Sequence, residues 1–160
     1  MIVVDGQQPD PLVVQIAAAL TPGRALDLAC GSGRNALWLA NNGWSVEAID
    51  NSPAALAAIP NTSGIHSHLA DLEKHEYEIE PNNWDLILMV RYLQRDLWQP
   101  AKLGLKPGGV IVVIVLLEDP NKQGRFRARS GELREAFNDF QILHSSEGEG
   151  LAKLAARKPY

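Results

Sequence analysis

One stretch of the chain, residues 24 to 36, decides the fold: it reads Arg24-Ala25-Leu26-Asp27-Leu28-Ala29-Cys30-Gly31-Ser32-Gly33-Arg34-Asn35-Ala36. An apolar run over residues 25–29 leads into two glycines, and a helical pattern follows over residues 34–42. This order is typical of a strand, a tight turn and a helix. Gly31 and Gly33 let the backbone turn sharply and approach a ligand, towards which the first amide groups of the helix point. The stretch therefore predicts a site for a nucleoside or dinucleotide cofactor.

The type of cofactor depends on Asp27. The glycine spacing also fits Gly-x-Gly-x-x-Ala, so a nicotinamide cofactor is an alternative on spacing alone. A nicotinamide-binding strand is normally apolar throughout, whereas here a carboxylate stands inside the strand. Such a carboxylate can order the glycine loop or, through water, help to hold an ammonium group. A glycine-rich turn that binds no ligand is the third interpretation.

Length and composition limit the class of protein. A chain of 160 residues suffices for one domain with a normal core, and is too short for separate cofactor and substrate domains. Its 46% hydrophobic and 21% charged residues are typical of a soluble globular protein. The net charge of −4 offers no electrostatic footprint for nucleic acid. We therefore expect a small-molecule substrate and no nucleic-acid partner.

The cellular compartment is predicted from cysteine usage and from the apolar runs. Cys30 is the single cysteine, which excludes an internal disulfide and suits a reducing compartment. The apolar run over residues 12–20 lacks a basic flank and is short for a membrane span. We expect a cytoplasmic protein that does not bind a membrane; the oligomeric state is not predicted.

The spacing of Asp27, Gly31 and Gly33 resembles motif I of the class I S-adenosylmethionine-dependent methyltransferases. A second signal, Leu-Lys-Pro-Gly-Gly over residues 105–109, resembles the turn before strand five of many of these enzymes. The order of motifs from Pro11 onward resembles the tellurite-resistance and thiopurine-like small-molecule methyltransferases. The turn over residues 147–150 is shorter and less basic than in tellurite-type members, which counts against tellurite as the acceptor.

This resemblance implies a function and leaves two alternatives. It implies S-adenosyl-L-methionine as cofactor and in-line transfer of its methyl group to a small, anionic or thiol-like acceptor. The first alternative is a nicotinamide-dependent oxidoreductase. The second is a non-catalytic protein that binds adenosylmethionine or adenosylhomocysteine.

The apolar runs predict an α/β fold. Strands are expected over residues 25–29, 45–49, 64–69, 84–90, 110–117, 140–145 and 151–156, and helices over residues 12–20, 34–42, 93–105 and 130–137, with a short helix after Ser52. Ser130 is the expected N-cap of the last helix, and Pro100 is expected to kink its helix or mark a restart. We expect a single domain over residues 1–160, with an N-terminal arm and helix over 1–22 and a Rossmann-like core over 23–160. The core is a doubly wound, mostly parallel seven-stranded sheet with a C-terminal antiparallel β-hairpin.

The cofactor site is predicted at the carboxyl ends of the first strands. Asp50 closes the second strand, near the distance from the glycine loop at which an acid meets a ribose, and a carboxylate can accept two hydrogen bonds from a diol. The resemblance assigns the adenine amino group to Asp71. The residues expected to contact the cofactor are Asp27, Ala29, Gly31, Gly33, Arg34, Asn35, Asp50, Asn51, Ser52, Ala70, Asp71, Leu72, Val90 and Arg91.

The acceptor side is predicted from two further segments. The end of the fourth strand resembles motif IV, so Arg91 and Tyr92 are candidates for substrate contact; the alternative is that they solvate a helix start. Arg125 and Arg127 belong to an Arg-Phe-Arg-Ala-Arg segment that, if extended, puts three guanidinium groups on one face. The alternative is an exposed loop that balances the acidic surface.

Titratable side chains are considered for two roles, as a general base and as metal ligands. A soft nucleophile needs little base catalysis, whereas an oxygen nucleophile needs a general base, for which Tyr92 and His144 are the candidates. His66 and His68 share one face of a strand, but no further ligand stands at a zinc-site spacing. We therefore expect no metal site.

Overall fold

The computed structural model describes residues 8–160, so the first part of the expected N-terminal arm, residues 1–7, lies outside the described residues. The chain falls into two compact units, Met1–Glu78 and Ile79–Tyr160. None of the helices in the described part of the chain has both the length and the apolar character needed to cross a membrane.

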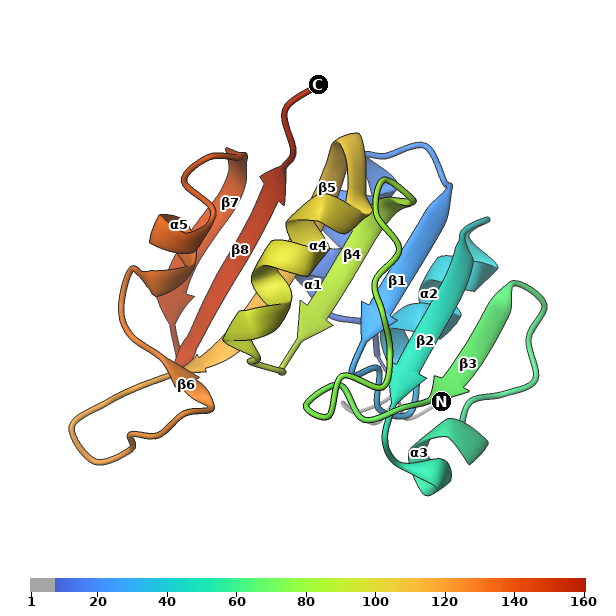
Figure 1. The fold of residues 1–160 in the computed structure, drawn as a ribbon, viewed down its shortest axis with the longest axis horizontal. Coiled ribbons are helices and arrows are strands. Elements are labelled where there is room, and N and C mark those ends of the chain that lie inside the picture. Colours follow the sequence, from blue (N-terminus) through green and yellow to red (C-terminus); the bar gives the residue numbers. More distant parts are fainter. Residues whose placement is uncertain (1–7) are drawn as a thin grey trace. The chain divides into compact units, whose positions relative to one another are not determined.

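The first unit is a parallel three-stranded sheet with helices. Its elements are α1 (Pro11–Ala18), β1 (Arg24–Leu28), α2 (Arg34–Asn41), β2 (Ser45–Asp50), α3 (Pro53–Ala57) and β3 (Ile65–Leu69). β2 lies between β1 and β3 and is parallel to both, with Asp27 opposite Ala48 and Ala48 opposite Ser67 (Figure 1). The carboxyl ends of the three strands therefore share one edge.

Two helices of this unit begin at an N-cap side chain. Asp10 caps α1, since its side chain accepts the Leu12 N–H at 2.9 Å, and Ser52 caps α3 by accepting the Ala55 N–H at 3.1 Å. Helix α2 begins differently, because its N-cap is Gly33 with φ of 82° and no side-chain cap. A Cβ on Gly33 would lie 2.8 Å from Ile59 Cγ1, so both the backbone angle and the packing require glycine there.

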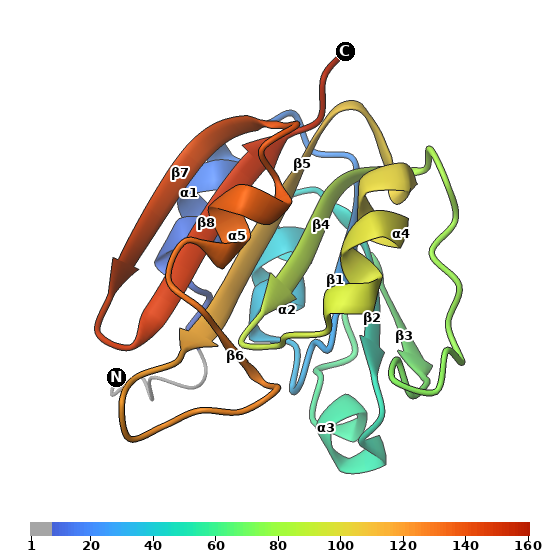
Figure 2. The same ribbon diagram turned by 60° about the vertical axis from the view of Figure 1, so that its left-hand side comes forward.

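The second unit is a mixed sheet. Its elements are β4 (Trp84–Val90), the 3₁₀-helix η2 (Arg95–Leu97), α4 (Trp98–Gly104), β5 (Leu105–Leu117), β6 (Arg127–Ala128), α5 (Glu132–Ala136), β7 (Gln141–Gly148) and β8 (Leu151–Arg157). β4 and β5 are parallel, whereas β8 runs antiparallel to both β5 and β7. Helices α4 and α5 cover the same face of this sheet (Figures 1 and 2). Every residue from Val110 to Val115 on β5 is buried, which makes β5 the centre of this unit's core.

Several helix and strand boundaries differ from the prediction, because contacts between residues far apart in the sequence determine them. The segment 105–109, predicted as a turn, belongs to β5, where Gly108 has φ of 82° and donates its N–H to Lys158 O. Ser130 is not the cap of α5, because Gly131 occupies that position and the Ser130 hydroxyl instead donates to Glu147 Oε1 at 2.7 Å. The two-residue β6 adds an eighth strand to the seven expected.

Two further predictions agree with the structure. Pro100 stands in the first turn of α4, where no intrahelical partner for an N–H is needed, and the helix restarts there after η2. The predicted C-terminal hairpin is confirmed as β7 and β8, joined through Glu149 and Gly150.

Replacing Gly33 by alanine should destabilise the protein more than the same change at Gly150. Both glycines have positive φ, 82° and 78°, but a Cβ on Gly150 meets nothing within 4 Å. We expect Gly33→Ala to lower the free energy of unfolding by about 2 to 4 kcal/mol and Gly150→Ala by about 1 kcal/mol. Urea unfolding followed by circular dichroism measures both; equal losses would contradict the packing argument.

Candidate functional site

The loop between β1 and α2 is held by Asp50 at the end of β2. Asp50 Oδ2 accepts the Gly31 N–H at 2.9 Å, and its Oδ1 accepts the Ser52 N–H at 3.0 Å. Cys30 N–H adds a bond to Ile49 O at 2.9 Å. Because a carboxylate oxygen has more than one lone pair, both oxygens of Asp50 keep capacity for a further donor. Asp50 thus orders the loop and can still accept the hydroxyls of a diol.

Around Gly31 the backbone is strained and open. Ala29 and Gly31 have φ of 59° and 58°, in the left-handed region. A Cβ on Gly31 would meet no atom within 4 Å, so its requirement for glycine comes from the backbone angle and not from crowding. The free space beside Gly31 suits the close approach of a ligand.

Asp27 is a buried carboxylate, and one of its two oxygens lacks a hydrogen-bond partner in the part of the chain that the structure describes. It is 2% exposed, and its Oδ2 has no hydrogen-bond partner among residues 8–160. Burial raises its pKa from 3.8 to about 7; the Arg34 guanidinium opposes this rise and the Asp50 carboxylate adds to it. A buried polar atom normally has a partner, since leaving one unpaired is costly. An ammonium group at Oδ2 would supply that partner, so the residues present fit an amino-acid-bearing nucleoside.

Cys30 is not equipped as a nucleophile. Burial, together with the Asp27 and Asp50 carboxylates, raises the pKa of its thiol. The thiolate is the reactive form, and it is scarce at neutral pH in such surroundings. The interpretation of Cys30 as a small residue in the turn agrees with this environment.

Arg34 and Asn35, both predicted to contact the cofactor, bond to the start of the described chain. Asn35 is 5% exposed, and its Oδ1 accepts the Asp10 N–H at 2.8 Å. Arg34 Nη1 donates to Gln8 O at 3.3 Å. These bonds tie the beginning of α1 to the beginning of α2; a cofactor contact by either side chain stays a prediction.

Residues 70–72 are brought to the same edge as Asp50. Ala70 N–H donates to Asp50 O at 3.0 Å, and Ala70 and Leu72 are buried. Asp71 Oδ1 accepts the N–H groups of Glu73 and Lys74, which closes a turn. Within the first unit the structure thus gathers the predicted residues of the loop, of Asp50 and of this turn at the carboxyl ends of three parallel strands.

In the second unit, the predicted acceptor residues follow β4. Arg91 is exposed with φ of 58°, and its N–H donates to Ile114 O at 2.7 Å. Tyr92 Oη donates to Gln94 Oε1, and Gln94 Nε2 donates to Asp96 Oδ1 at 2.8 Å. The Tyr92 hydroxyl is therefore oriented by a chain of hydrogen bonds. Its role as a base is not tested by this geometry.

The three arginines of residues 125–129 do not form one row. Only Arg127 and Ala128 are extended as β6, and Arg127 Nη1 turns back to Leu117 O at 3.0 Å. The Arg125 guanidinium lies over the Phe126 ring, 4.5 Å from its centroid. Arg129 Nε lies 3.8 Å from Glu132 Oε1.

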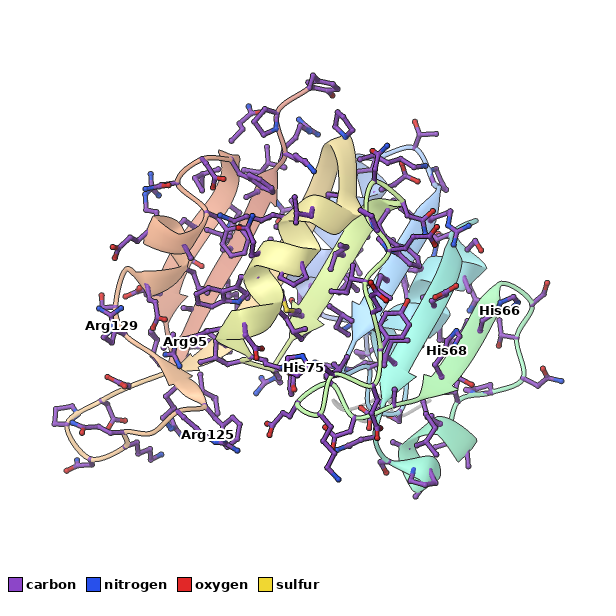
Figure 3. The ribbon with its side chains drawn as sticks, in the orientation of Figure 1. His66, His68, His75, Arg95, Arg125 and Arg129 are labelled. Carbon is purple, nitrogen blue, oxygen red and sulfur yellow. The ribbon has the colours of Figure 1, made fainter. Side chains whose placement is uncertain are left out.

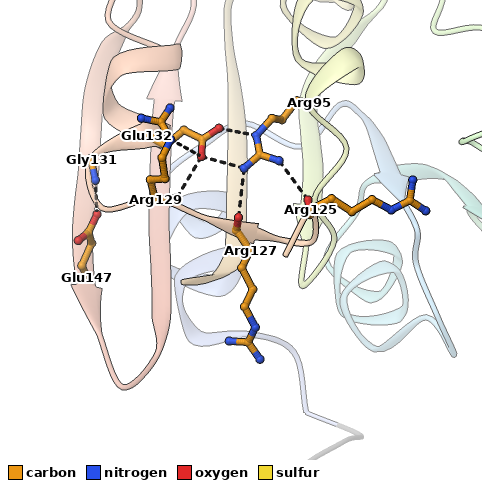
Figure 4. Close-up of polar contacts among 7 residues, drawn as sticks. All are labelled: Arg95, Arg125, Arg127, Arg129, Gly131, Glu132 and Glu147. Atoms are coloured by element: carbon orange, nitrogen blue, oxygen red, sulfur yellow. Dashed lines mark hydrogen bonds and ion pairs between the residues drawn. The ribbon is translucent and has the colours of Figure 1, made fainter. Parts of the chain in front are cut away.

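A pair that sequence reasoning missed, Arg95 and Glu132, organises this segment (Figure 4). Arg95 donates from Nε to Glu132 Oε2 and from Nη2 to Glu132 Oε1 at 2.9 Å. The hydrogen bond from Arg95, with smaller help from the Arg129 N–H, lowers the pKa of Glu132 although burial opposes it. No spacing in the sequence signals this pair, because its members stand 37 residues apart.

The histidines do not gather into a metal site. His66 and His68 lie on β3 and His75 in the loop that follows (Figure 3). His68 Nε2 lies 3.7 Å from Glu47 Oε2, and His144 Nε2 lies 2.9 Å from Ser146 Oγ. Within the described range, no three of His, Cys, Asp and Glu come together as metal ligands.

The match to one family model shows the family to which the chain belongs. The family model described as "Tellurite resistance protein TehB" matches residues 9–156. "Hemagglutinin 1" of Eikenella corrodens is 26% identical over 147 residues, which cover 82% of this chain and 48% of that protein. The "Probable S-adenosyl-L-methionine-dependent methyltransferase TehB" of Haemophilus influenzae is 25% identical over 154 residues, covering 86% of this chain and 53% of its own length. The chain thus spans about half the length of these curated relatives.

A solved structure shows the same fold. The crystal structure of TehB from Haemophilus influenzae superposes with a TM-score of 0.81 and 23% identity, covering 93% of this chain and 62% of that one. This likeness confirms the predicted α/β Rossmann-like class, with mostly parallel strands and an antiparallel C-terminal pair. The resemblance to the tellurite-resistance methyltransferases is likewise confirmed by the family match.

The burial of Asp27 should make stability depend on pH. Its pKa is higher in the folded protein than in the unfolded chain, so the folded form holds its proton more strongly and stability falls as pH rises between the two values. Between pH 5 and pH 8 the wild type should lose about 2.5 kcal/mol relative to Asp27→Asn. Urea unfolding of both proteins at the two pH values measures this. An unchanged difference would show that Asp27 is not held protonated.

Proposed function

Because the chain belongs to the TehB tellurite-resistance family, we propose that it is an S-adenosyl-L-methionine-dependent methyltransferase that acts on a small-molecule acceptor. One observation carries the proposal. The Asp50 carboxylate binds the Gly31 and Ser52 amides, while Asp27, on the neighbouring strand, has an unpaired buried oxygen. A sugar diol and an ammonium group are the donors that these two carboxylates lack.

We assign the cofactor contacts within the first unit by chemistry. Asp50 accepts the two ribose hydroxyls, Asp27 the ammonium group, and Asp71 Oδ2 the adenine amino group. The open space beside Gly31 admits the cofactor's amino-acid part. The residues assigned to its walls are Ala29, Gly33, Arg34, Asn35, Asn51, Ser52, Ala70 and Leu72, with Val90 and Arg91 added from the family resemblance.

The reaction requires alignment more than acid or base catalysis. S-adenosylmethionine supplies a methyl group on a positively charged sulfur, and the reaction ends with adenosylhomocysteine. Held at Asp27, Asp50 and Asp71, the cofactor would supply an electrophilic methyl group, and the chain would place an acceptor lone pair in line with the carbon–sulfur bond. Positioning alone can contribute about 7 to 11 kcal/mol at its limit. A thiolate needs no base, whereas for an oxygen acceptor Tyr92 and His144 are the bases we propose.

The acceptor we propose is a small anion or thiol. Arg91, Tyr92, Arg125 and Arg127 are its proposed contacts. The net charge of −4 disfavours nucleic acid as partner, and the absence of an internal disulfide suits the cytoplasm. A nicotinamide-dependent oxidoreductase is the second candidate, disfavoured by the carboxylate inside β1.

Asp50→Ala should weaken the binding of adenosylhomocysteine by about 10- to 150-fold, the loss of about 1.5 to 3 kcal/mol expected for charge-assisted hydrogen bonds. Glu78→Gln, at an exposed carboxylate of the same unit, is the matched control and should leave the affinity unchanged. Isothermal titration calorimetry measures both, with NADH as the competing ligand. Unaltered affinity in Asp50→Ala removes the ribose assignment, and tight binding of NADH alone favours the oxidoreductase.

Turnover separates an enzyme from a binding protein. With methyl-labelled S-adenosylmethionine, the wild-type chain should transfer label to 2-mercaptobenzoate, 2-mercaptobenzamide or tellurite. The products are separated by chromatography and counted. Tight binding of adenosylhomocysteine with no transfer to any of the three would favour a non-catalytic role.

A further inference from the structure

Arg95 donates four hydrogen bonds to residues between 125 and 132. Besides its two bonds to Glu132, it donates from Nη1 to Arg125 O at 3.0 Å and from Nη2 to Arg127 O at 3.1 Å (Figure 4). An arginine fork suits such a multiple contact because its donors have a fixed planar geometry. The backbone at residues 125 and 127 is thereby fixed from outside the segment.

Glu132 completes the anchor from the other end. Its side chain is 7% exposed, and its Oε1 also accepts the Arg129 N–H at 3.0 Å. Glu147 adds a neighbouring contact, since its Oε2 accepts the Gly131 N–H at 2.7 Å. The ion pair of Arg95 and Glu132 therefore holds the segment 118–131 through backbone hydrogen bonds at residues 125, 127 and 129.

The position of this ion pair in the sheet points to a ligand. Arg95 follows β4, and the anchored segment follows β5, which is parallel to β4. In open α/β sheets, ligands bind outside the carboxyl ends of parallel strands. The ion pair thus links the segments that follow β4 and β5, which flank such a ligand position. The segment after β4 contains Tyr92.

The charge of the anchored segment indicates what it would bind. Residues 118–131 contain four basic side chains, at 122, 125, 127 and 129, and two acidic ones, at 118 and 119, which gives 4 − 2 = +2. The whole chain has a net charge of −4, so this segment stands out as locally basic. Phe126 is 49% exposed, and the Arg125 guanidinium lies over its ring. The segment therefore offers a ligand an aromatic surface beside the positive charge.

We propose that Arg95 is a positioning residue, with Glu132 as its partner, and that the pair holds residues 118–131 in the conformation that binds an anionic acceptor. The proposal rests on the methyltransferase function proposed above. Arg95 acts through the backbone that it fixes, and the basic side chains of the segment contact the anion. An uncharged acceptor of the same shape gains nothing from this arrangement.

Two variants and one control test the pair. Arg95→Lys keeps the positive charge but loses the fork that reaches the two carbonyl oxygens, and Glu132→Gln keeps the shape but loses the ion pair. Asp139→Asn removes the partner of Lys102, another ion pair of the same unit that does not touch the segment. Thermal unfolding verifies that each variant is folded.

The acceptor readout compares two probes that differ only in charge. Apparent KM and kcat are measured for 2-mercaptobenzoate and for 2-mercaptobenzamide with labelled S-adenosylmethionine. We expect Arg95→Lys and Glu132→Gln to raise the KM for the benzoate at least about fivefold, and that for the benzamide less than about twofold, as charge-assisted contacts require. The kcat values and the affinity for adenosylhomocysteine should not change, and Asp139→Asn should behave as wild type.

A second readout follows the segment itself. Trypsin should cleave after Arg125 and Arg127 at least about fivefold faster in the two variants than in wild type or Asp139→Asn, because their backbone is no longer held. Unchanged cleavage, or an equal rise of KM for both probes, overturns the proposal while leaving the methyltransferase function intact. Wild type that binds adenosylhomocysteine without methylating 2-mercaptobenzoate overturns the anionic acceptor. Failure to bind adenosylhomocysteine overturns the proposed function itself.

Discussion

The hydrogen bonds from the Gly31 and Ser52 amides to the Asp50 carboxylate are the constraint on which the candidate site depends. The Gly31 amide in the loop after β1 is not bonded within a helix or strand, and backbone amides that are removed from water need partners. Asp50 supplies one from the end of the next strand, and Ala70 N–H binds its carbonyl in turn. One residue at the end of β2 thus couples the three segments that follow β1, β2 and β3.

Asp27 and Asp50, the two carboxylates of the candidate site in the first unit, have different environments. Asp50 accepts one backbone donor on each oxygen, whereas burial raises the pKa of Asp27 to about 7. We propose that these two carboxylates bind a ligand that carries both hydroxyl groups and a cation. In the second unit, the Glu132 carboxylate has a different role. Both of its oxygens are paired with Arg95, and the pair fixes the segment that precedes α5.

The sequence predicted what local pattern determines. The strand, glycine turn and helix around Gly31 follow from periodicity and from backbone freedom, and the N-cap at Ser52 follows from residue type. The sequence-based prediction failed where contacts between residues far apart in the sequence determine the structure. The Ser130 hydroxyl is drawn to Glu147, Gly108 is paired with Lys158, and Arg127 turns to Leu117. The anchor between Arg95 and Glu132 could not be predicted, because no local rule brings those residues together.

We propose that Asp27 and Asp50 together form the pocket for S-adenosylmethionine. A crystal structure of the chain with adenosylhomocysteine tests it most directly. We expect ribose hydroxyls within hydrogen-bond distance of Asp50, and the ligand's amino group facing Asp27 Oδ2 directly or through one water. An empty loop at saturating ligand, or a ribose bound away from Asp50, would contradict it.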